Sequence, residues 1–311
     1  MTTALVADPL CETHDPGHGH PEKPRRFRAV MNALDSAGLT AKLTRLEPRD
    51  ATIDDLALVH ARSYLALAER EIEAGASQLS TGDTQVNNRS WAAAQRAAGS
   101  AIAAIDAVCT GHAQRAFCVV RPPGHHAGAA YGMGFCVVNN IALAARHAQK
   151  RHGLGKVLIV DWDVHHGNGT QDIFYEDGSV FFCSTHQSPW YPGTGAKDET
   201  GRGDGLGTTM NFPLPAASGR AEVLGAIETK LVAAMEKFRP ELVLVSAGFD
   251  SRINDPLGQF TLTDEDFADL TRVVRKVADD HAQGRVVSLL EGGYSLTGLA
   301  SASAAHVTAL L

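Results

Sequence analysis

Residues 156–169 read KVLIVDWDVHHGNG, an aliphatic run that is followed at once by aspartates, histidines and glycines. An apolar run without polar alternation is typical of a strand that is covered on both faces in a parallel sheet. Asp161, Asp163 and His165 alternate with apolar residues where the run ends, so their side chains can point in the same direction. The stretch therefore predicts a buried parallel strand with a polar site at its carboxyl end.

Strands and helices alternate along the rest of the chain. Short runs rich in β-branched residues predict strands at residues 2–7, 115–120, 156–160, 180–184, 241–246 and 285–290. Longer segments of helical period predict helices at residues 91–108, 139–151, 220–238 and 264–283. Residues 193–209 contain six glycines and predict a series of turns. This order predicts a three-layer α/β/α architecture in one domain that spans residues 1–311.

The composition excludes several classes of protein. The 311 residues carry a formal net charge of -7 and no block of basic residues, so neither a nucleic acid nor a membrane is expected as a partner. The five cysteines include no Cys-x-x-Cys pair, which favours reduced thiols over disulfides or a thiolate metal site. No apolar run is long enough to span a membrane, and the opening MTTALVADPL lacks the features of a secretion signal, so we expect a cytoplasmic protein. The composition leaves open whether the chain forms a homo-oligomer.

Polar loops follow five of the predicted strands. They read RPPGHH, DWDVHHGNG, THQSPWYPGTG, AGFDSRINDP and EGGY. Ligands of open parallel sheets bind beyond the carboxyl ends of the strands. We therefore expect these loops, which are dense in His, Asp, Gly and Tyr, to meet along one edge of the sheet and to form the functional site.

Asp163, His165 and Asp255 form a candidate metal site. Two carboxylates and one imidazole leave a coordination position free for water, which is the pattern of a catalytic metal centre rather than a structural one. Zn²⁺ suits this mixed set best, and Fe²⁺ or Co²⁺ would also fit. An isolated Asp-x-His pair more often consists of ordinary loop residues, and it is the neighbouring histidines that favour a metal centre here.

His125 and His126 are adjacent and follow two prolines and a glycine. Two imidazoles beside a metal-bound water could supply a general base and an electrostatic partner, provided that neighbouring groups fix their tautomers. We expect Asp161 to hold one ring and Asn168 the other, which would give the two histidines different pKa values. Asp161 could instead bind a second, monovalent cation.

Three aromatic residues lie beside glycines in these loops. Tyr294 follows two glycines, and its phenol could stabilise the oxyanion of a tetrahedral intermediate. Phe135 and Tyr191 could form the walls of a narrow tunnel. Considered alone, a tyrosine such as Tyr294 is more often packed at a sheet edge, and core packing or a surface ring explains Phe135 and Tyr191 about as well.

Longer motifs connect the chain with a known family. RPPGHHA, GFCVVNN, DWDVHHGNGTQ, YPGTG, SAGFDSRINDP and LEGGY occur in this order, with HPEKPRR near the amino terminus. Together they resemble the histone deacetylase and acetylpolyamine amidohydrolase family over residues 5–305, and its class II-like bacterial members in particular. The resemblance implies the arginase-deacetylase fold, an α/β fold with a central, mostly parallel eight-stranded sheet. It also implies zinc-dependent hydrolysis of an acyl amide.

The resemblance implies roles for single residues. The zinc ligands are matched by Asp163, His165 and Asp255. His126 matches the general base, with His125 as its electrostatic partner. Tyr294 matches the residue that polarises the scissile carbonyl together with zinc. Asn168 stands where many relatives have an aspartate behind the second histidine.

Substrate and potassium sites follow from the same resemblance. Phe135 and Tyr191 match an aromatic clamp, and Gly134 matches a backbone acceptor. Arg26 matches an inner-cavity arginine for acetate release, and Asp83 matches a rim aspartate. An inner potassium (K⁺) site is matched by Asp161, Asp163, His165, Ser184 and Thr185. An outer one is matched by Phe174, Asp177, Val180 and Asn211.

These features favour an active deacylase that converts acetyl-lysine, or another acyl-lysine of a protein or peptide, to free lysine and a carboxylate. An acetylpolyamine amidohydrolase, acting on a small acylated amine, is one alternative. A non-catalytic module that binds acyl-lysine is another, although every catalytic position is filled by a competent residue. The polyamine-selective branch has a glutamate two residues after the metal-binding aspartate, where this chain has the uncharged Leu257. We therefore expect an acyl-lysine substrate.

Overall fold

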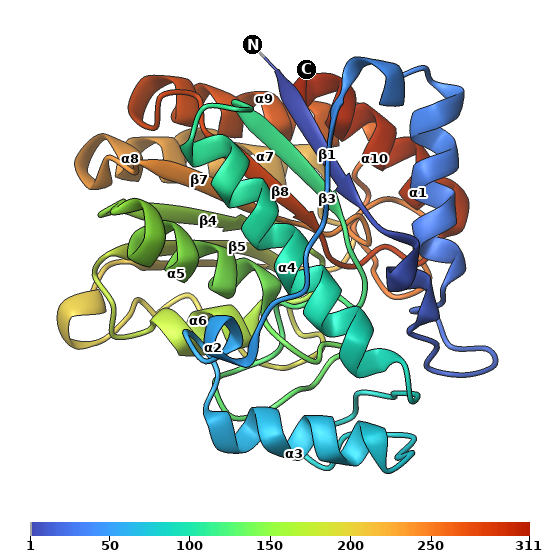
Figure 1. The fold of residues 1–311 in the computed structure, drawn as a ribbon. Helices are drawn as coiled ribbons and strands as arrows, with labels where there is room; N and C mark the ends of the chain where they lie inside the picture. Colours follow the sequence, from blue (N-terminus) through green and yellow to red (C-terminus); the bar gives the residue numbers. More distant parts are fainter. Residues whose placement is uncertain (1) are drawn as a thin grey trace.

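One parallel sheet forms the centre of the computed structural model, which describes residues 2–311 (Figure 1). Its eight strands follow the order β2-β1-β3-β8-β7-β4-β5-β6, and every pair is parallel. The strands are β1 (Thr3–Ala7), β2 (Thr44–Leu46), β3 (Arg115–Val119), β4 (Val157–Asp161), β5 (Val180–Gln187), β6 (Thr209–Leu214), β7 (Leu242–Ala247) and β8 (Val286–Leu290). The expected eight-stranded sheet is therefore confirmed.

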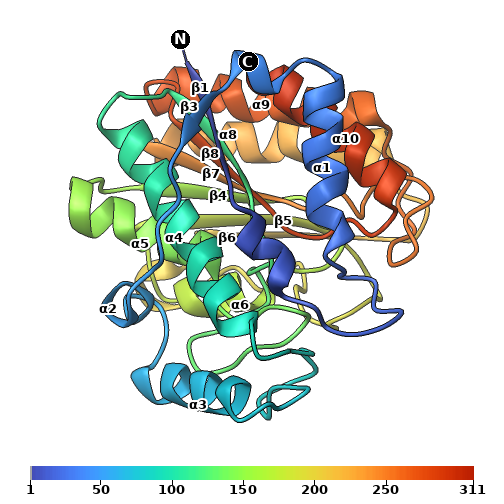
Figure 2. The same ribbon diagram turned by 45° about the vertical axis from the view of Figure 1, so that its right-hand side comes forward.

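Helices cover both faces of the sheet (Figure 2). On one face pack α2 (Ile53–Leu56), α3 (Arg62–Glu73), α4 (Ser90–Cys109), α5 (Asn140–His152) and α6 (Asn168–Phe174). On the other pack α1 (Arg25–Ser36), α7 (Arg220–Ala226), α8 (Val232–Phe238), α9 (Asp264–His281) and α10 (Leu296–Leu310). Each face has its own cluster of buried apolar side chains, so the three-layer α/β/α architecture is also confirmed.

Local signals explain the ends of the helices beside the site. The Asn139 side chain accepts a hydrogen bond from Ala142 N at 2.9 Å at the start of α5, and Gly153 ends this helix in the left-handed conformation with φ 70°. Thr263 and Asp266 form a capping box at the start of α9, in which each side chain accepts a hydrogen bond from the backbone N–H of the other. The two N-terminal caps fix where the loops at the functional edge end, whereas Gly153 ends α5 away from that edge.

The six predicted strands are all present, and none of their boundaries differs by more than three residues. The largest difference is in β5, which continues to Gln187 because its last residues pair with β6. Three predicted helices correspond to α4, α5 and α9. The fourth, at residues 220–238, is divided, because a π-helical turn at Ile227–Leu231 separates α7 from α8.

Several helices and strands of the structure are not predicted by the sequence patterns. β2 has only three residues, and β6 contains Pro213, which an edge strand tolerates because one side of its backbone needs no partner. Helices α1, α2, α3, α6 and α10 were also not predicted. The short 3₁₀ turns are at Pro9–Thr13, Thr40–Lys42 and Gly203–Gly205, the last within the segment expected to form turns.

Loops from distant parts of the chain meet at the carboxyl edge of the sheet. Val164 N, after β4, donates to Asp250 Oδ1 after β7 at 2.8 Å. Gly292 N, after β8, donates to Asp163 Oδ2 at 2.8 Å. Backbone N–H groups of one loop thus hold carboxylates of another, and the sheet brings together the motifs that the sequence separates.

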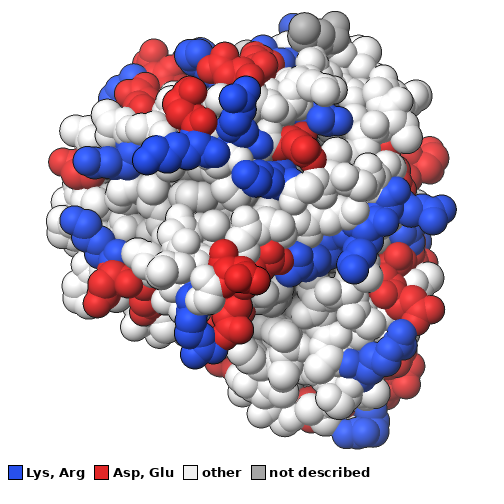
Figure 3. Space-filling model, turned by 90° about the vertical axis from the view of Figure 1, so that its left-hand side faces the viewer, with Lys and Arg blue, Asp and Glu red and all other residues white. Residues whose placement is uncertain are grey.

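Charged side chains are mixed on the face drawn in Figure 3. Lysine and arginine lie among aspartate and glutamate over most of this face, and several basic side chains gather toward the right of the view. In the chain from residue 2 to 311, no helix has both the length and the apolar character that a membrane crossing requires.

Candidate active site

Three buried donors lie together beyond β4 and β7. The ligand atoms of Asp163, His165 and Asp250 are all within 4.8 Å of one another. His165 Nδ1 lies 2.9 Å from Asp163 Oδ1 and 3.2 Å from Asp250 Oδ2. Asp250 was not among the predicted ligands, although its place in SAGFD, shortly after a buried strand, was the available signal.

Asp255, the predicted third ligand, lies beside this group but not within it. Its Oδ2 accepts hydrogen bonds from Tyr294 N at 2.7 Å and from Ser295 N at 3.0 Å. Its Oδ1 accepts one from Leu257 N at 3.0 Å. The backbone therefore fixes the orientation of this carboxylate, and its role as a metal ligand stays a prediction.

The buried carboxylates of this group require positive charge between them. Burial and the charge of Asp163 raise the pKa of Asp250 to about 7. Burial alone would lower the pKa of His165, but hydrogen bonds to Asp163 and Asp250 raise it to about 10. A proton on His165 thus carries positive charge at the position where a divalent cation would bind, so the donor set fits a metal ion.

The two adjacent histidines have different partners. His125 Nδ1 donates to Asp161 Oδ2 at 2.9 Å, and His126 Nδ1 donates to Asn168 Oδ1 at 2.7 Å. Asn168 uses its Nδ2 to donate to the Tyr131 hydroxyl at 3.2 Å, which leaves its Oδ1 as the acceptor for His126. In this tautomer the lone pair of His126 is on Nε2.

The different partners give the two imidazoles different charges. Burial acts to lower the pKa of His125, but the charges of Asp161 and Asp163 outweigh it and raise the pKa well above 6.5. The pKa of His126 lies well below 6.5, because its ring is buried and because His125 and His165 are positively charged. His126 is therefore neutral at pH 7 and able to accept a proton, while His125 is charged.

Glu291 holds the loop that carries the histidines, a role that sequence reasoning missed. Its Oε2 accepts hydrogen bonds from Gly124 N at 2.7 Å and from His125 N at 3.2 Å. Its Oε1 accepts one from the Ser246 hydroxyl at 3.2 Å. Burial raises the pKa of Glu291 to about 7. The acidic residue in LEGGY was the signal that could have pointed to it.

Arg26 fixes the loop that carries Tyr294. Its Nε donates to Gly293 O at 2.7 Å, and its guanidinium carbon lies 5.0 Å from the centre of the Tyr294 ring. The guanidinium is fully buried and pairs with Glu22, whose carboxylate also binds Arg121. Glu22 and Arg121 were not predicted, because a buried ion pair leaves no periodic pattern in the sequence.

A narrow cavity of about 250 Å³ leads to these residues. It is lined by Asp83, His126, Gly134, Phe135, His165, Trp190, Tyr191, Leu257 and Tyr294. The lining includes every residue predicted for the clamp and the rim. Trp190 was not predicted, and its indole Nε1 donates to Leu257 O at 2.8 Å at the mouth.

Gly134 allows the cavity wall to approach the histidines. Its φ is +56°, and a Cβ at this position would lie 2.3 Å from His126 Cδ2. Its N–H donates to Asp83 Oδ1 at 2.7 Å, and the Tyr191 hydroxyl donates to the same oxygen at 3.2 Å. Asp83 therefore ties the two sides of the mouth together, and only glycine fits at position 134.

The residues predicted for two potassium sites lie on both sides of β5. Asp161 pairs with Ser184 in the sheet register, and Thr185 follows, with all three side chains buried. Asp177 N donates to Phe174 O, and Val180 N donates to Asp177 O, so these three residues mark two consecutive turns between α6 and β5. The Asn211 amide on β6 donates to Gln171 Oε1 at 2.7 Å. The two potassium sites stay predictions.

Known proteins share this fold and these loops. Residues 20–310 match the family described as histone deacetylase domain. The histone deacetylase 10, chloroplastic, of Oryza sativa subsp. japonica is 41% identical over 320 residues, which cover 97% of this chain and 72% of the relative. The histone deacetylase-like amidohydrolase of Pseudomonas aeruginosa is 40% identical over 311 residues, which cover 94% of this chain and 82% of the relative.

Two further comparisons extend this similarity. The polyamine deacetylase HDAC10 of Homo sapiens is 40% identical over 322 residues, which cover 100% of this chain and 46% of the relative. The crystal structure of the HDA15 HD domain superposes with a TM-score of 0.94 at 36% identity, covering 99% of this chain and 88% of that one. The fold and the site together define a hydrolase of the deacetylase type. This chain belongs to the histone deacetylase and acetylpolyamine amidohydrolase family.

If His126 is the proton acceptor, its pKa should determine the acid side of the pH range of activity. Because the pKa of His126 is held below 6.5, we expect kcat/KM of the wild type to fall only well below pH 6.5 on the acid side. Asn168→Asp places a negative charge beside the ring and favours its protonated form. The acid limb of the kcat/KM profile should then move to higher pH, by about one to three pH units.

Glu176→Gln is the control for this change, because Glu176 is an exposed residue just beyond the same helix. It should leave the profile where it is in the wild type. An acid limb that does not move in Asn168→Asp would show that His126 is not the proton acceptor.

We expect the hydroxyl of Tyr294 to act in the chemistry of the site and to contribute little to folding. Within residues 2–311 no group forms a hydrogen bond with it, while its ring packs edge-on against Phe135 at 5.9 Å. Tyr294→Phe should therefore unfold at nearly the wild-type temperature but lose on the order of a hundredfold in kcat. Thermal unfolding and steady-state kinetics measure the two effects.

Tyr64→Phe is the matched control for the hydroxyl. The Tyr64 hydroxyl is buried and donates to Val137 O at 2.5 Å, so its loss should reduce the free energy of unfolding by about 1 kcal/mol and leave kcat almost unchanged. A Tyr294→Phe variant with nearly normal kcat would contradict the assignment.

Proposed function

We propose that this chain is a zinc-dependent deacylase that hydrolyses the amide of acetyl-lysine, or of another acyl-lysine, to free lysine and a carboxylate. The observation that carries the proposal is the pair of buried histidines with different partners. His126, which donates to Asn168, is kept neutral by burial and by the positive charges near it, while His125 is kept charged by Asp161. Both lie at the end of a narrow cavity beside an Asp/His donor group. An acyl-binding module without catalysis would have no use for this difference in charge.

The cavity suits a thin aliphatic chain. At about 250 Å³ it is small, and the rings of Phe135 and Tyr191 belong to its wall. The stem of a lysine side chain is apolar along its length, and aromatic rings bury such a stem without requiring hydrogen bonds from it. The acyl amide at the end of the stem would then lie near His126 and Tyr294.

The chain's own residues can carry out hydrolysis of this amide. A zinc ion held by Asp163, His165 and a third carboxylate would lower the pKa of a water molecule and polarise the acyl carbonyl. His126 Nε2 accepts a proton from the attacking water as its oxygen bonds to the carbonyl carbon. The Tyr294 hydroxyl donates a hydrogen bond to the oxyanion, and His125 adds positive charge nearby. As the C–N bond breaks, the proton on His126 passes to the leaving amine.

Two carboxylates are candidates for the third metal ligand. The family resemblance supports Asp255, whose carboxylate is oriented by backbone N–H groups in the way that outer hydrogen bonds orient metal ligands. Proximity supports Asp250, whose buried Oδ2 lies 3.2 Å from His165 Nδ1 and has no conventional hydrogen-bond partner among residues 2–311. We propose Asp255 as the ligand and Asp250 as a carboxylate that balances charge beside it.

Metal analysis of two variants decides between these carboxylates. Asp255→Ala should lose the zinc of the Asp163 and His165 group together with all activity, whereas Asp250→Asn should keep the zinc of that group. The asparagine keeps the oxygen that accepts from Val164 N, so this loop should stay in place. The reverse order of zinc loss would assign the metal to Asp250 instead.

Two buried oxygen atoms support the potassium sites that the resemblance implies. Thr185 Oγ1 and Asn211 Oδ1 are both buried without a hydrogen-bond partner in the described chain, residues 2–311. Buried polar atoms without a partner are costly, and an oxygen-binding cation is one way to satisfy them. We propose potassium for these positions, as structural ions rather than reactants.

The mouth of the cavity favours a neutral substrate over a polyamine. A polyamine carries ammonium groups beyond the scissile amide, and their desolvation requires carboxylates at the rim. Leu257 offers apolar contact there, and the Asp83 carboxylate is already engaged by Gly134 and Tyr191. Because HDAC10 of Homo sapiens is named a polyamine deacetylase, acetylpolyamine hydrolysis is the second candidate function.

Competition between two substrates tests this preference. The wild type should have a higher kcat/KM for an acetyl-lysine peptide than for acetylspermidine. Leu257→Glu should shift the ratio of these two kcat/KM values toward acetylspermidine by about tenfold or more, because a new charge pair contributes about 1 to 2 kcal/mol. Leu206→Glu is the matched control, because Leu206 is 69% exposed and lies outside the cavity. A wild type that prefers acetylspermidine would overturn the acyl-lysine assignment.

A further inference from the structure

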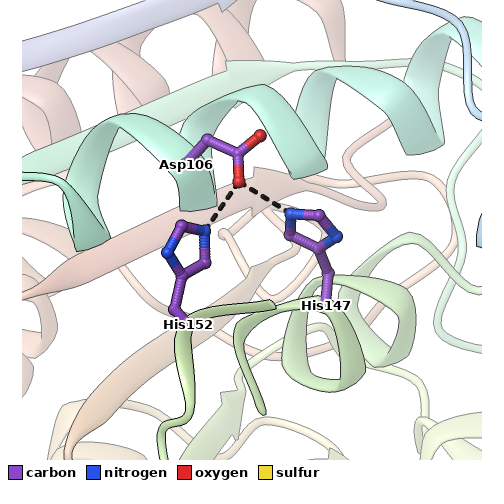
Figure 4. A group of neighbouring side chains, drawn as sticks. All are labelled: Asp106, His147 and His152. Carbon is purple, nitrogen blue, oxygen red and sulfur yellow. Dashed lines mark hydrogen bonds and ion pairs between the residues drawn. The ribbon is translucent and has the colours of Figure 1, made fainter. Parts of the chain in front are cut away.

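A second group of metal-binding side chains lies between α4 and α5. Asp106 is in the last turn of α4, and His147 and His152 are in the last two turns of α5. Figure 4 shows both imidazoles pointing at the same carboxylate, which reaches down from the neighbouring helix. The Nε2 atom of each histidine lies 2.7 Å from Asp106 Oδ1. The three ligand atoms are all within 4.8 Å of one another.

This group is remote from the candidate active site. Helix α5 begins at Asn140, whose side chain donates to Pro122 O at 3.2 Å beside the loop of the catalytic histidines. A helix rises about 1.5 Å per residue, so its end at His152 lies roughly 20 Å from that loop. None of the three residues is part of the cavity lining. The proposed deacylase chemistry therefore does not explain them.

The local electrostatics favour a cation at this point. Helices α4 and α5 both end here, at Cys109 and His152, and the carboxyl end of a helix carries partial negative charge. Asp106 adds a full negative charge. The basic residues in the last turn of α5, Lys150 and Arg151, are exposed to solvent, whereas the histidines face the carboxylate.

The accessibility of the group also suits a metal ion with water ligands. The His147 and His152 side chains are 9% and 16% exposed, which fixes their rings, while Asp106 is 45% exposed. Two fixed imidazoles and one accessible carboxylate would leave coordination positions open toward solvent. Metal–ligand distances of about 2.0 to 2.2 Å require the three donor atoms to separate only slightly from their present spacing.

We propose that Asp106, His147 and His152 form a second metal site, which binds a first-row divalent cation of the Zn²⁺, Cu²⁺ or Ni²⁺ type. Imidazole and carboxylate together suit these ions better than Mg²⁺ or Ca²⁺, which prefer oxygen ligands throughout. On binding, each ring keeps one proton, which moves from Nε2 to Nδ1, and the Nε2 lone pair bonds to the metal. The ion would clamp the ends of α4 and α5 together.

Electron paramagnetic resonance with Cu²⁺ as the probe separates this site from the catalytic one. The catalytic donor group contains one imidazole, His165, whereas the second site contains two. Wild-type protein loaded with a single equivalent of Zn²⁺, which the buried group should take up first, should give a signal with coupling to two nitrogen atoms when Cu²⁺ is added. Copper that displaced zinc from the Asp163 and His165 group would show coupling to one.

Variants assign the signal to residues. The double variant His147→Gln/His152→Gln retains side chains that can donate to Asp106, so its fold should persist, and the two-nitrogen signal should disappear. Equilibrium dialysis against Zn²⁺ should in parallel show one bound equivalent fewer than in the wild type. His18→Gln is the control, because His18 is an exposed histidine outside both groups, and it should leave signal and stoichiometry unchanged.

The second metal site can be tested even if the double variant does not fold. If it does not, the single variant His152→Gln, at the end of α5, should reduce the coupling from two nitrogens to one. A wild type that binds no copper with two-nitrogen coupling, or a two-nitrogen signal that survives in the double variant, overturns the second site. In that case Asp106 is only a hydrogen-bond acceptor for the two imidazoles. Loss of deacylase activity does not enter this test, so it stands apart from the proposed function.

Discussion

The burial of several carboxylates at one edge of the sheet is the constraint on which this structure depends. Asp161, Asp163, Asp250 and Glu291 are fully buried, and Asp255 is nearly so. A buried carboxylate is costly unless positive charge or hydrogen-bond donors surround it. Here the positive charge comes from imidazoles and a buried arginine, and the donors are backbone N–H groups of loops that follow other strands. Burial still raises the pKa values of Asp250 and Glu291, each to about 7, so this compensation is incomplete.

The same constraint dictates where glycine is needed. A Cβ on Gly292 would lie 2.0 Å from Asp250 Oδ2, and one on Gly248 would lie 2.2 Å from Asp163 Oδ2. Both positions bring the backbone against a carboxylate that needs N–H donors, so any side chain would push the donors away. The glycines in the SAGFD and LEGGY motifs are thus a consequence of the buried charge. Motifs that read as flexible loops in the sequence are rigid parts of the site.

The sequence predicts the parts of this protein that repeat a local pattern. The central strands are continuous apolar runs, and the polar residues after them could be assigned to one edge by topology alone. Edge strands β2 and β6 are short or contain proline, so their pattern is weak. Glu22 and Arg121 were missed because their pairing is a tertiary contact between distant residues. Asp250 was missed because the family pattern points to Asp255, although the Asp250 carboxylate lies nearer to Asp163 and His165. Sequence reasoning found the chemistry of the site more readily than the groups that support it.

The two Asp/His groups of the chain differ in how they are positioned, and this difference has consequences for their behaviour. Asp163 and Asp250 are held by backbone N–H groups, so the fold sets the positions of their carboxylates before any cation binds. The Asp106 carboxylate is partly exposed, and the two imidazoles are its only side-chain partners within residues 2–311. Its donors can therefore adjust to ions of different size, at the cost of side-chain ordering when an ion binds. The buried group should thus bind more selectively and more tightly, whereas the group between the helices should respond to the concentration of free metal around the protein.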